Sequence, residues 1–183
     1  MKVPLDKLTA RDPELIQYFV VHHSVADPAT PIDELASMEM ASQGFVTIGY
    51  NAVIVKDSRG WAVHEGRPLN TLPAAQFGLN EQGYAVCIGG NYHPNVQDVP
   101  TNAVDPASLD VLIGRIGTVK QEAPNLKFLI AHRDIATIKA KHGGRAADYS
   151  TACCGDLLYA HMDALRAATG LAKPPELDSF DSR

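Results

Sequence analysis

Histidines at two positions and a cysteine at a third give this chain the side chains best suited to bind a transition metal. His22 and His23 end an apolar stretch, His132 follows another, and Cys153 precedes a C-terminal amphipathic segment. The separations are long, with 110 positions between 22 and 132 and 21 between 132 and 153. Short structural zinc clips have closer spacing, whereas ligands from separate strand ends suit a catalytic zinc that keeps one position for water.

The residues alone leave several alternatives open. Only one of His22 and His23 can face a given side of a strand, because successive side chains point to opposite faces. A lone histidine at a strand end is usually a hydrogen-bonded structural residue, and a buried free cysteine usually acts as a small apolar side chain. Tyr50, taken by itself, is most simply a core aromatic. Composition and spacing therefore indicate an α/β domain with a candidate metal site.

The composition is that of a soluble globular domain. The 183 residues are 45% hydrophobic and 20% charged, which suffices for a substantial core. Sixteen basic and 21 acidic residues give a formal charge of −5, which disfavours a nucleic-acid-binding protein. No apolar run reaches the roughly 18–20 residues that cross a bilayer, and residues 1–17 lack the apolar centre of a signal peptide. We expect a monomer that is synthesised in the cytoplasm.

Cysteine usage favours the reduced state. Cys87, Cys153 and Cys154 are too few and too unevenly spaced for a disulfide framework, and two of them are adjacent in the sequence. A free thiolate is then available as a metal ligand.

The elements that must position these side chains follow from the apolar pattern. Runs of β-branched and aromatic residues predict strands at 16–23, 50–56, 61–65, 84–89 and 126–131, with the second and third forming a hairpin. Helical spacing predicts helices at about 107–123 and 156–169. A further helix is predicted between a Thr30 cap and Gly44, with Leu35, Met38 and Met40 on its inner side.

Strands interleaved with helices predict an α/β fold, in which a central mixed β-sheet is flanked by helices on both faces. We expect one domain over residues 1–183, with a core at about 16–170 and a loose polar tail at 171–183. Residues 93–106 are rich in Pro, Asn and Asp and are expected to form a surface loop.

Six short motifs occur in a fixed order along the chain. They are Val-His-His-Ser at 21–24, Ile-Gly-Tyr-Asn at 48–51, Glu-Gly-Arg-Pro at 65–68, Ala-Val-Cys-Ile-Gly-Gly-Asn-Tyr at 85–92, Ala-His-Arg-Asp-Ile at 131–135 and Thr-Ala-Cys-Cys-Gly-Asp-Leu-Leu-Tyr at 151–159. In this order the motifs resemble the successive signatures of phage lysozyme-type N-acetylmuramoyl-L-alanine amidases and animal peptidoglycan recognition proteins. The resemblance runs from about residue 16 to residue 165.

The resemblance implies a ligand set for one Zn²⁺ per chain. The first histidine of the His-His pair is a zinc ligand in the family, and it matches His22. The histidine of Ala-His-Arg-Asp matches His132, and the cysteine that normally precedes Pro-Gly matches Cys153. Cys154 stands where the family usually has proline, and a one-residue shift that makes it the ligand is the less favoured alternative.

The resemblance also implies two catalytic residues. The tyrosine of Gly-Tyr-Asn, which is catalytic in active members, matches Tyr50, and Thr151 matches a position that is lysine or threonine in active members. Zinc lowers the pKa of a bound water from about 15.7 toward roughly 7, and Tyr50 or Thr151 would hydrogen bond the reacting oxygens. Cys87 replaces the glutamate of the cytosolic recycling enzymes, so this chain is more similar to the phage and recognition-protein branch.

Substrate contacts transfer less directly. Ala75 stands where the family commonly has a groove-lining histidine, five residues before an asparagine that matches Asn80. Asn80 and Arg67 are the candidate substrate-binding residues.

The implied activity is hydrolysis of the amide between the muramyl lactyl group and L-alanine of peptidoglycan, by a cell-wall-lytic enzyme of endolysin or effector type. Such an enzyme acts on the cell wall after release or secretion by another system. The alternatives are a non-catalytic peptidoglycan-binding recognition module and a cytosolic amidase that recycles muropeptides.

Overall fold

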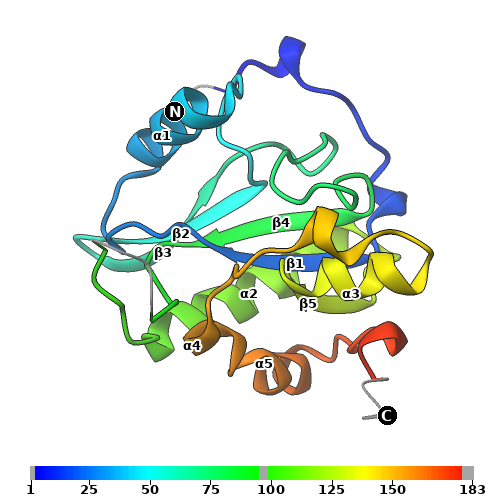
Figure 1. Ribbon diagram of the computed structural model, residues 1–183. Coiled ribbons are helices and arrows are strands. Elements are labelled where there is room, and N and C mark those ends of the chain that lie inside the picture. The colour runs from blue at the N-terminus through cyan, green and yellow to red at the C-terminus, as the bar shows by residue number, and fades with distance from the viewer. Residues whose placement is uncertain (1–2, 95–98, 179–183) are drawn as a thin grey trace.

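A five-stranded mixed sheet forms the centre of the computed structural model, which describes residues 3–94 and 99–178 (Figure 1). Its strands are β1 Tyr18–His23, β2 Ala52–Asp57, β3 Gly60–Glu65, β4 Gly83–Ile88 and β5 Phe128–Ala131. The spatial order is β3-β2-β4-β1-β5. β1 runs parallel to both β4 and β5, β2 runs parallel to β4, and β3 pairs antiparallel with β2. The predicted mixed sheet and hairpin are therefore confirmed.

The two strands at the centre of the sheet are buried along their whole length. Every residue of β1 and β4 is buried, which is why both read as continuous apolar runs rather than alternating ones. The edge strand β3 is only half-buried and continues from β2 through a tight turn, in which the Asp57 carboxylate accepts a hydrogen bond from the Arg59 N–H at 2.7 Å.

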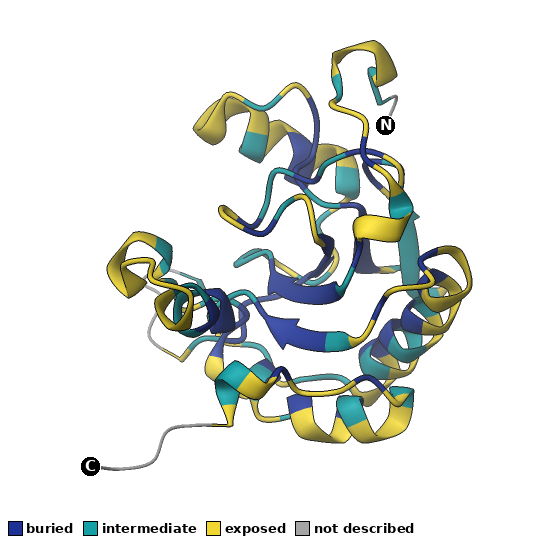
Figure 2. Cartoon of the chain, turned by 90° about the vertical axis from the view of Figure 1, so that its right-hand side faces the viewer, coloured by how far each residue is buried: buried dark blue, intermediate teal, exposed yellow. Residues whose placement is uncertain are grey.

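Helices cover both faces of the sheet, as predicted. On one face, α2 Pro106–Glu122 and α5 Met162–Thr169 pack against side chains such as Phe19 and Val21 of β1. On the other, α1 Ile32–Gln43 packs on Val53 and Val55, and α3 Asp134–Lys141 packs on Val20. Figure 2 shows the buried strands between helices whose outer sides are exposed. None of the described helices is long and apolar enough to span a membrane.

Helix α1 differs from the prediction in its start and its inner side. Pro31 rather than Thr30 is the N-cap residue, and no side chain caps this end. Met38 and Met40 are 49% and 45% exposed, so the expectation that they face the core is wrong. The helix contacts the sheet only through its first turns, where Leu35 is buried. Its predicted end is confirmed, since Gly44 adopts the left-handed conformation with φ 68°.

The C-terminal helix is divided into two pieces. α4 Asp156–Tyr159 and α5 are separated by a 3₁₀ turn, in which the His161 N–H donates to the Leu158 carbonyl instead of continuing the α-helical ladder. The sequence pattern spanned this break because the apolar spacing on either side is helical. Helix α3 was not predicted at all, since eight residues carry too few apolar positions to show a period.

Short 3₁₀ helices complete the described structure at Leu5–Lys7, Pro13–Leu15, Ala146–Tyr149 and Pro175–Leu177. The first part of the expected C-terminal tail lies against the outer edge of β5. Leu171 is buried, and Ala172 exchanges backbone hydrogen bonds with Lys127 and Leu129. Residues 179–183 of that tail, and 95–98 of the loop expected at 93–106, lie outside the described residues.

Candidate metal centre

Three metal-binding side chains meet at the carboxyl ends of β1 and β5. His22 is the penultimate residue of β1 and His132 directly follows β5, and these neighbouring parallel strands end at the same edge of the sheet. Cys153 reaches this edge from the loop before α4. The ligand atoms of all three lie within 4.8 Å of one another, and the Cys153 Sγ is 3.7 Å from His22 Nδ1.

The adjacent candidates, His23 and Cys154, face away from this group. The His23 Nδ1 accepts a hydrogen bond from the Tyr92 N–H at 3.1 Å on the opposite side of the strand. Cys154 is fully buried in the apolar core beneath α2 and α5. The pleat of β1 therefore brings His22 to the group, and the loop presents Cys153 rather than its neighbour.

Gln76 orients the His22 ring. The Gln76 Oε1 lies 3.2 Å from His22 Nε2, and the Gln76 Nε2 donates to the Leu79 carbonyl at 3.3 Å. An amide oxygen can only accept, so Nε2 carries the proton and Nδ1 keeps a free lone pair directed at Cys153. A histidine held in this tautomer is ready to bind a cation.

The electrostatics of the three side chains fit a divalent metal. Burial lowers the pKa of His22 well below its usual value, with His132 adding to the effect, and lowers that of His132 to about 4. Both rings are therefore neutral at neutral pH, which is the ligand form. Burial also raises the pKa of the Cys153 thiol to about 12, although the hydrogen bond from the His23 N–H acts to lower it. Two imidazoles and one sulfur form a donor set typical of zinc, which would offset the burial of a thiolate.

An open cavity of about 320 Å³ lies over this group. The three candidate ligands are among the residues that line it, so a metal ion that they held would be reachable from the cavity. The residues that line it are His22, His23, Val25, Tyr50, Ala75, His93, His132, Thr151, Ala152 and Cys153. The structure thus brings Tyr50 and Thr151 together with the three predicted ligands.

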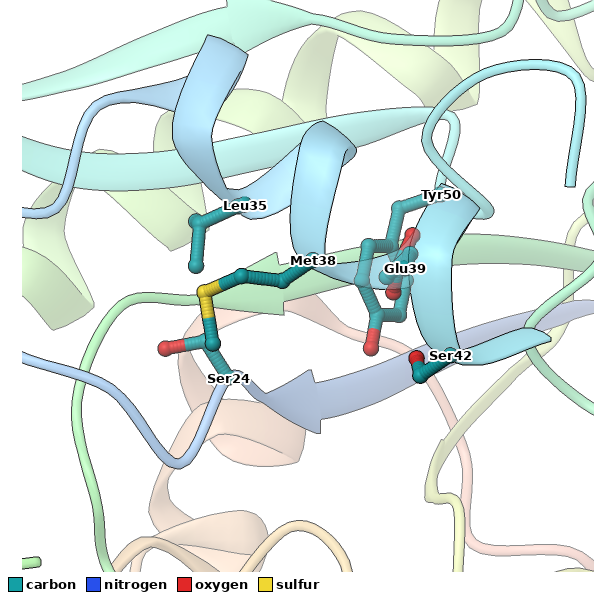
Figure 3. Close-up of a pocket in the computed structure, with 6 residues that line it drawn as sticks. All are labelled: Ser24, Leu35, Met38, Glu39, Ser42 and Tyr50. Carbon is teal, nitrogen blue, oxygen red and sulfur yellow. The ribbon is translucent and has the colours of Figure 1, made fainter. Parts of the chain in front are cut away.

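Tyr50 separates this cavity from a second, smaller pocket of about 150 Å³ beneath α1. Figure 3 shows its ring beside Glu39, whose Oε2 accepts a hydrogen bond from the Gly49 N–H at 2.6 Å. The ring centroid lies 5.1 Å from that of His22. Burial raises the pKa of Tyr50 well above its ordinary value, and its hydrogen bond to the Glu39 carboxylate raises it further, so the hydroxyl remains protonated and donates to Glu39.

Thr151 holds the loop that presents the cysteine. Its Oγ1 accepts a hydrogen bond from the Cys153 N–H at 3.2 Å, a local turn that leaves the hydroxyl proton for another partner. Because Thr151 lines the cavity, that partner can be an oxygen of a bound ligand.

Asn80 and Arg67 are not among the residues that line the cavity. The Asn80 side chain accepts from the Gln76 N–H at 3.1 Å, which closes the turn that carries Gln76. The Arg67 Nε donates to the Ile48 carbonyl at 2.8 Å, just before Tyr50, and only 8% of Arg67 is exposed. Both residues shape the segments around the site, and their contact with a substrate stays a prediction.

Ala75 and Cys87 both lie near the site. Ala75 lines the cavity, and its methyl group leaves more room there than a larger side chain would. Cys87 is paired with His22 across β4 and β1, and it is fully buried in the apolar cluster with Val53. It is a core residue.

Sequence reasoning missed Gln76, Glu39 and His93, all of which lie at or beside the two pockets. Gln76 and Glu39 have no motif or periodicity that marks them, and only tertiary turns bring them to the site. His93 directly follows one of the six motifs and is a titratable residue in a loop, which could have marked it.

Three solved structures with similar folds are named as an amidase, a recognition protein and an endolysin. N-acetylmuramoyl-L-alanine amidase LysC from Clostridium intestinale superposes with a TM-score of 0.64 at 19% identity, over 87% of this chain and 89% of that one. Bumblebee PGRP-SA superposes with a TM-score of 0.66 at 21% identity, over 89% of each chain. The endolysin of the Thermus scotoductus bacteriophage Ph2119 gives 0.62 at 15% identity, over 88% and 89%.

No protein-family model matches the sequence, and no curated protein matches it. The structural likeness covers nearly the whole length of both partners in each comparison. The chain has the fold shared by N-acetylmuramoyl-L-alanine amidases and peptidoglycan recognition proteins.

Proposed function

We propose that the protein is a zinc-dependent N-acetylmuramoyl-L-alanine amidase that hydrolyses the amide between the muramyl lactyl group and L-alanine. The observation that carries the proposal is the convergence of His22, His132 and Cys153 on the floor of an open cavity. Amidases and an endolysin among the similar structures support the same reaction.

The roles of the side chains follow from their positions. His22, His132 and Cys153 would hold one zinc ion, which supplies Lewis acidity that activates water and polarises a carbonyl oxygen. Tyr50 keeps its proton and would exchange its hydrogen bond to Glu39 for one to the carbonyl oxygen as negative charge develops there. Thr151, which lines the same cavity, can donate a second one, with its hydroxyl already oriented by the Cys153 N–H.

A non-catalytic recognition module is the alternative from another class. Such a module needs a groove for the glycan peptide but no metal. The complete ligand group, the Gln76 that fixes the His22 tautomer and a protonated Tyr50 together favour catalysis. A recycling amidase for small muropeptides is less favoured, because Cys87 is buried core where those enzymes carry a glutamate.

The biological substrate we propose is peptidoglycan of a bacterial cell wall, which the enzyme degrades as an endolysin or an effector. The protein acts as a monomer on a polymer that lies outside the cytoplasm. Ala75, which lines the cavity in place of an imidazole, is a candidate determinant of the stem peptide that is accepted.

The test combines metal analysis of the purified protein with mass spectrometry of purified peptidoglycan after incubation. We expect about one zinc per chain and released stem peptides that begin with L-alanine. Zinc without released peptide, over several wall types, would refute the amidase function in favour of recognition. Absence of zinc at full activity would refute the metal assignment.

A pair of variants separates metal binding from catalysis. Cys153→Ala should lose zinc and activity together, because it removes one of three ligands. Tyr50→Phe should keep the zinc and lower kcat by roughly 100-fold or more, the size of effect seen when an oxyanion donor is removed. Unchanged kinetics in Tyr50→Phe would remove this residue from the mechanism.

A further inference from the structure

We propose that His93 donates the proton to the leaving amine and that Asp156 positions its ring. The inference deepens the proposed amidase function and rests on it. Amide hydrolysis needs such a donor, because the nitrogen leaves poorly as an anion and must be protonated as the C–N bond breaks.

The position of His93 suits this role. It lines the cavity together with the three metal ligands but is not one of the group whose ligand atoms lie within 4.8 Å of one another. It comes from the loop after β4, whereas the ligands come from β1, from the end of β5 and from the loop before α4. The imidazole therefore lines the same cavity as the three proposed ligands without being one of them.

Asp156 fixes which ring nitrogen faces the cavity. The His93 Nδ1 is shielded from solvent and has no hydrogen-bond partner among the described residues, and it lies 3.5 Å from the Asp156 Oδ2, which is within ion-pair distance. Catalytic hydrogen bonds are often long before a substrate binds. With Nδ1 turned to the carboxylate, Nε2 is the nitrogen left for the cavity, and the carboxylate stabilises the positive charge of the protonated ring.

Arg133 holds this carboxylate in place. Its NH1 donates to Asp156 Oδ1 at 2.7 Å, and its other donors bind the carbonyls of Ala152 and Cys153. The hydrogen bond from Arg133 also lowers the pKa of Asp156, which stays ionised at neutral pH. Asp156 thus has one oxygen for Arg133 and the other for His93.

The other protonatable groups that line the cavity have different tasks. His22, His132 and Cys153 would bind the metal. The His23 Nδ1 accepts the Tyr92 N–H, which requires a neutral ring. Tyr50 is a half-buried phenol whose proton is hydrogen-bonded to Glu39. Among the described residues around this cavity, His93 is the group left to transfer a proton.

The step balances with water as the second reactant. The water oxygen bonds to the lactyl carbonyl carbon, and the C–N bond then breaks with its electron pair on nitrogen. That nitrogen takes the proton from His93 Nε2 and leaves as the amine. The proton released by the attacking water restores His93, so nothing else is consumed.

The experiment compares two substrates that differ in their need for a proton. One is an N-acetylmuramoyl-L-alanyl peptide, whose leaving group is a basic amine. The other is the p-nitroanilide of N-acetylmuramic acid, whose leaving group, p-nitroaniline, is only a weak base. We expect His93→Gln to lower kcat on the peptide by about 100-fold or more, the usual size of general acid catalysis. The fold-decrease in kcat on the p-nitroanilide should be smaller by a factor of at least about 10, and the variant should keep its zinc.

His142→Gln is the matched control, since His142 is also paired with a carboxylate, Glu176, at 2.9 Å but lies outside the cavity. It should leave both rates unchanged. His93→Ala provides a second variant, whose rate on the peptide should be partly restored by free imidazole.

Equal losses on both substrates, or an unchanged rate on the peptide, would overturn the role of His93, and so would failure of imidazole to restore His93→Ala. Failure of the unsubstituted, zinc-loaded protein on both substrates is a separate result that would refute the amidase function itself.

Discussion

The two nitrogens of His22 have different partners, and this division determines what the ring can do. Nε2 faces the Gln76 carbonyl oxygen, and Nδ1 faces Cys153. Outer partners of metal-binding histidines typically change metal affinity by 10–100-fold when they are removed. Gln76 is therefore part of the proposed metal site although it binds no metal itself.

Replacing Gln76 tests this coupling. Gln76→Leu should weaken zinc affinity by about 10–100-fold, because the ring loses the partner that fixes its tautomer. Competition with a chelator of known affinity gives the measurement. Gln121→Leu, at an exposed glutamine of α2, is the control and should bind zinc as the native protein does. Equal affinity in both variants would contradict the role assigned to Gln76.

Glu39 gives a pH-dependent prediction. Burial raises its pKa in the folded protein, against the hydrogen bond from the Gly49 N–H and the nearby Arg67. A carboxyl whose folded pKa is raised favours folding in its protonated form, and that contribution is lost as pH rises through the folded pKa. Glu39→Gln should therefore melt at a higher temperature than the native protein at pH 8, and the difference should vanish near pH 4. A difference that is independent of pH would contradict this account.

The residues of the proposed metal site could be predicted because their types are rare and their motifs are ordered. The residues that hold them in place could not be predicted. Gln76 has its role only because a turn places it against β1, and Glu39 only because α1 lies over Tyr50. Val25, a β-branched residue at φ 54° on the cavity wall, has a backbone conformation that no local sequence rule predicts.

At the scale of elements, strand β4 supports the site because its first residue, Gly83, has no side chain. A Cβ added at Gly83, the first residue of β4, would lie 1.9 Å from Gln76 Nε2. Gly83 therefore leaves the space that the Gln76 side chain fills on its way to His22. This strand supplies no proposed ligand, yet its first residue determines where one ligand points.

Gly83→Ala should consequently weaken zinc affinity in the same direction as Gln76→Leu, and it should also destabilise the fold by about 1–3 kcal/mol through overpacking. Chemical denaturation and zinc competition give the two quantities. Gly114→Ala is the control, because a Cβ there meets nothing within 4 Å in helix α2. It should stabilise the protein by about 1 kcal/mol and leave the metal affinity unchanged. Native zinc affinity in Gly83→Ala would refute the coupling.

Strand positions were predicted well, and helix details less so. Five apolar runs gave five strands, because buried parallel strands and a hairpin have strong local signals. The inner side of α1 was wrong because only its first turns meet the sheet, and the break before α5 was missed because both halves keep helical spacing. Such features depend on what each helix packs against, which its own sequence does not contain.

For the whole molecule, the proposed metal joins three segments that are far apart in the chain. His22, His132 and Cys153 come from β1, from beyond β5 and from the loop before α4. Binding to the folded state alone stabilises it, by about 2.7 kcal/mol when the free ligand is at 100 times its dissociation constant.

Zinc should therefore raise the melting temperature by roughly 5–10 °C at that concentration, given about 2–4 °C per kcal/mol for a domain of this size. Cys153→Ser should remove most of this shift. Differential scanning fluorimetry with and without a chelator measures it, and an equal shift in the variant would show that zinc stabilises the protein from another site.

The order of the ligands along the chain has a consequence for biosynthesis. The ribosome makes the segment that carries His22 early, but Cys153 follows 131 residues later. At translation rates of about 5–20 residues per second, roughly 7–26 s separate the two. During that interval the nascent chain has the segment of β1 but no complete ligand set, so the proposed activity would arise only after Cys153 and the elements before it have been made.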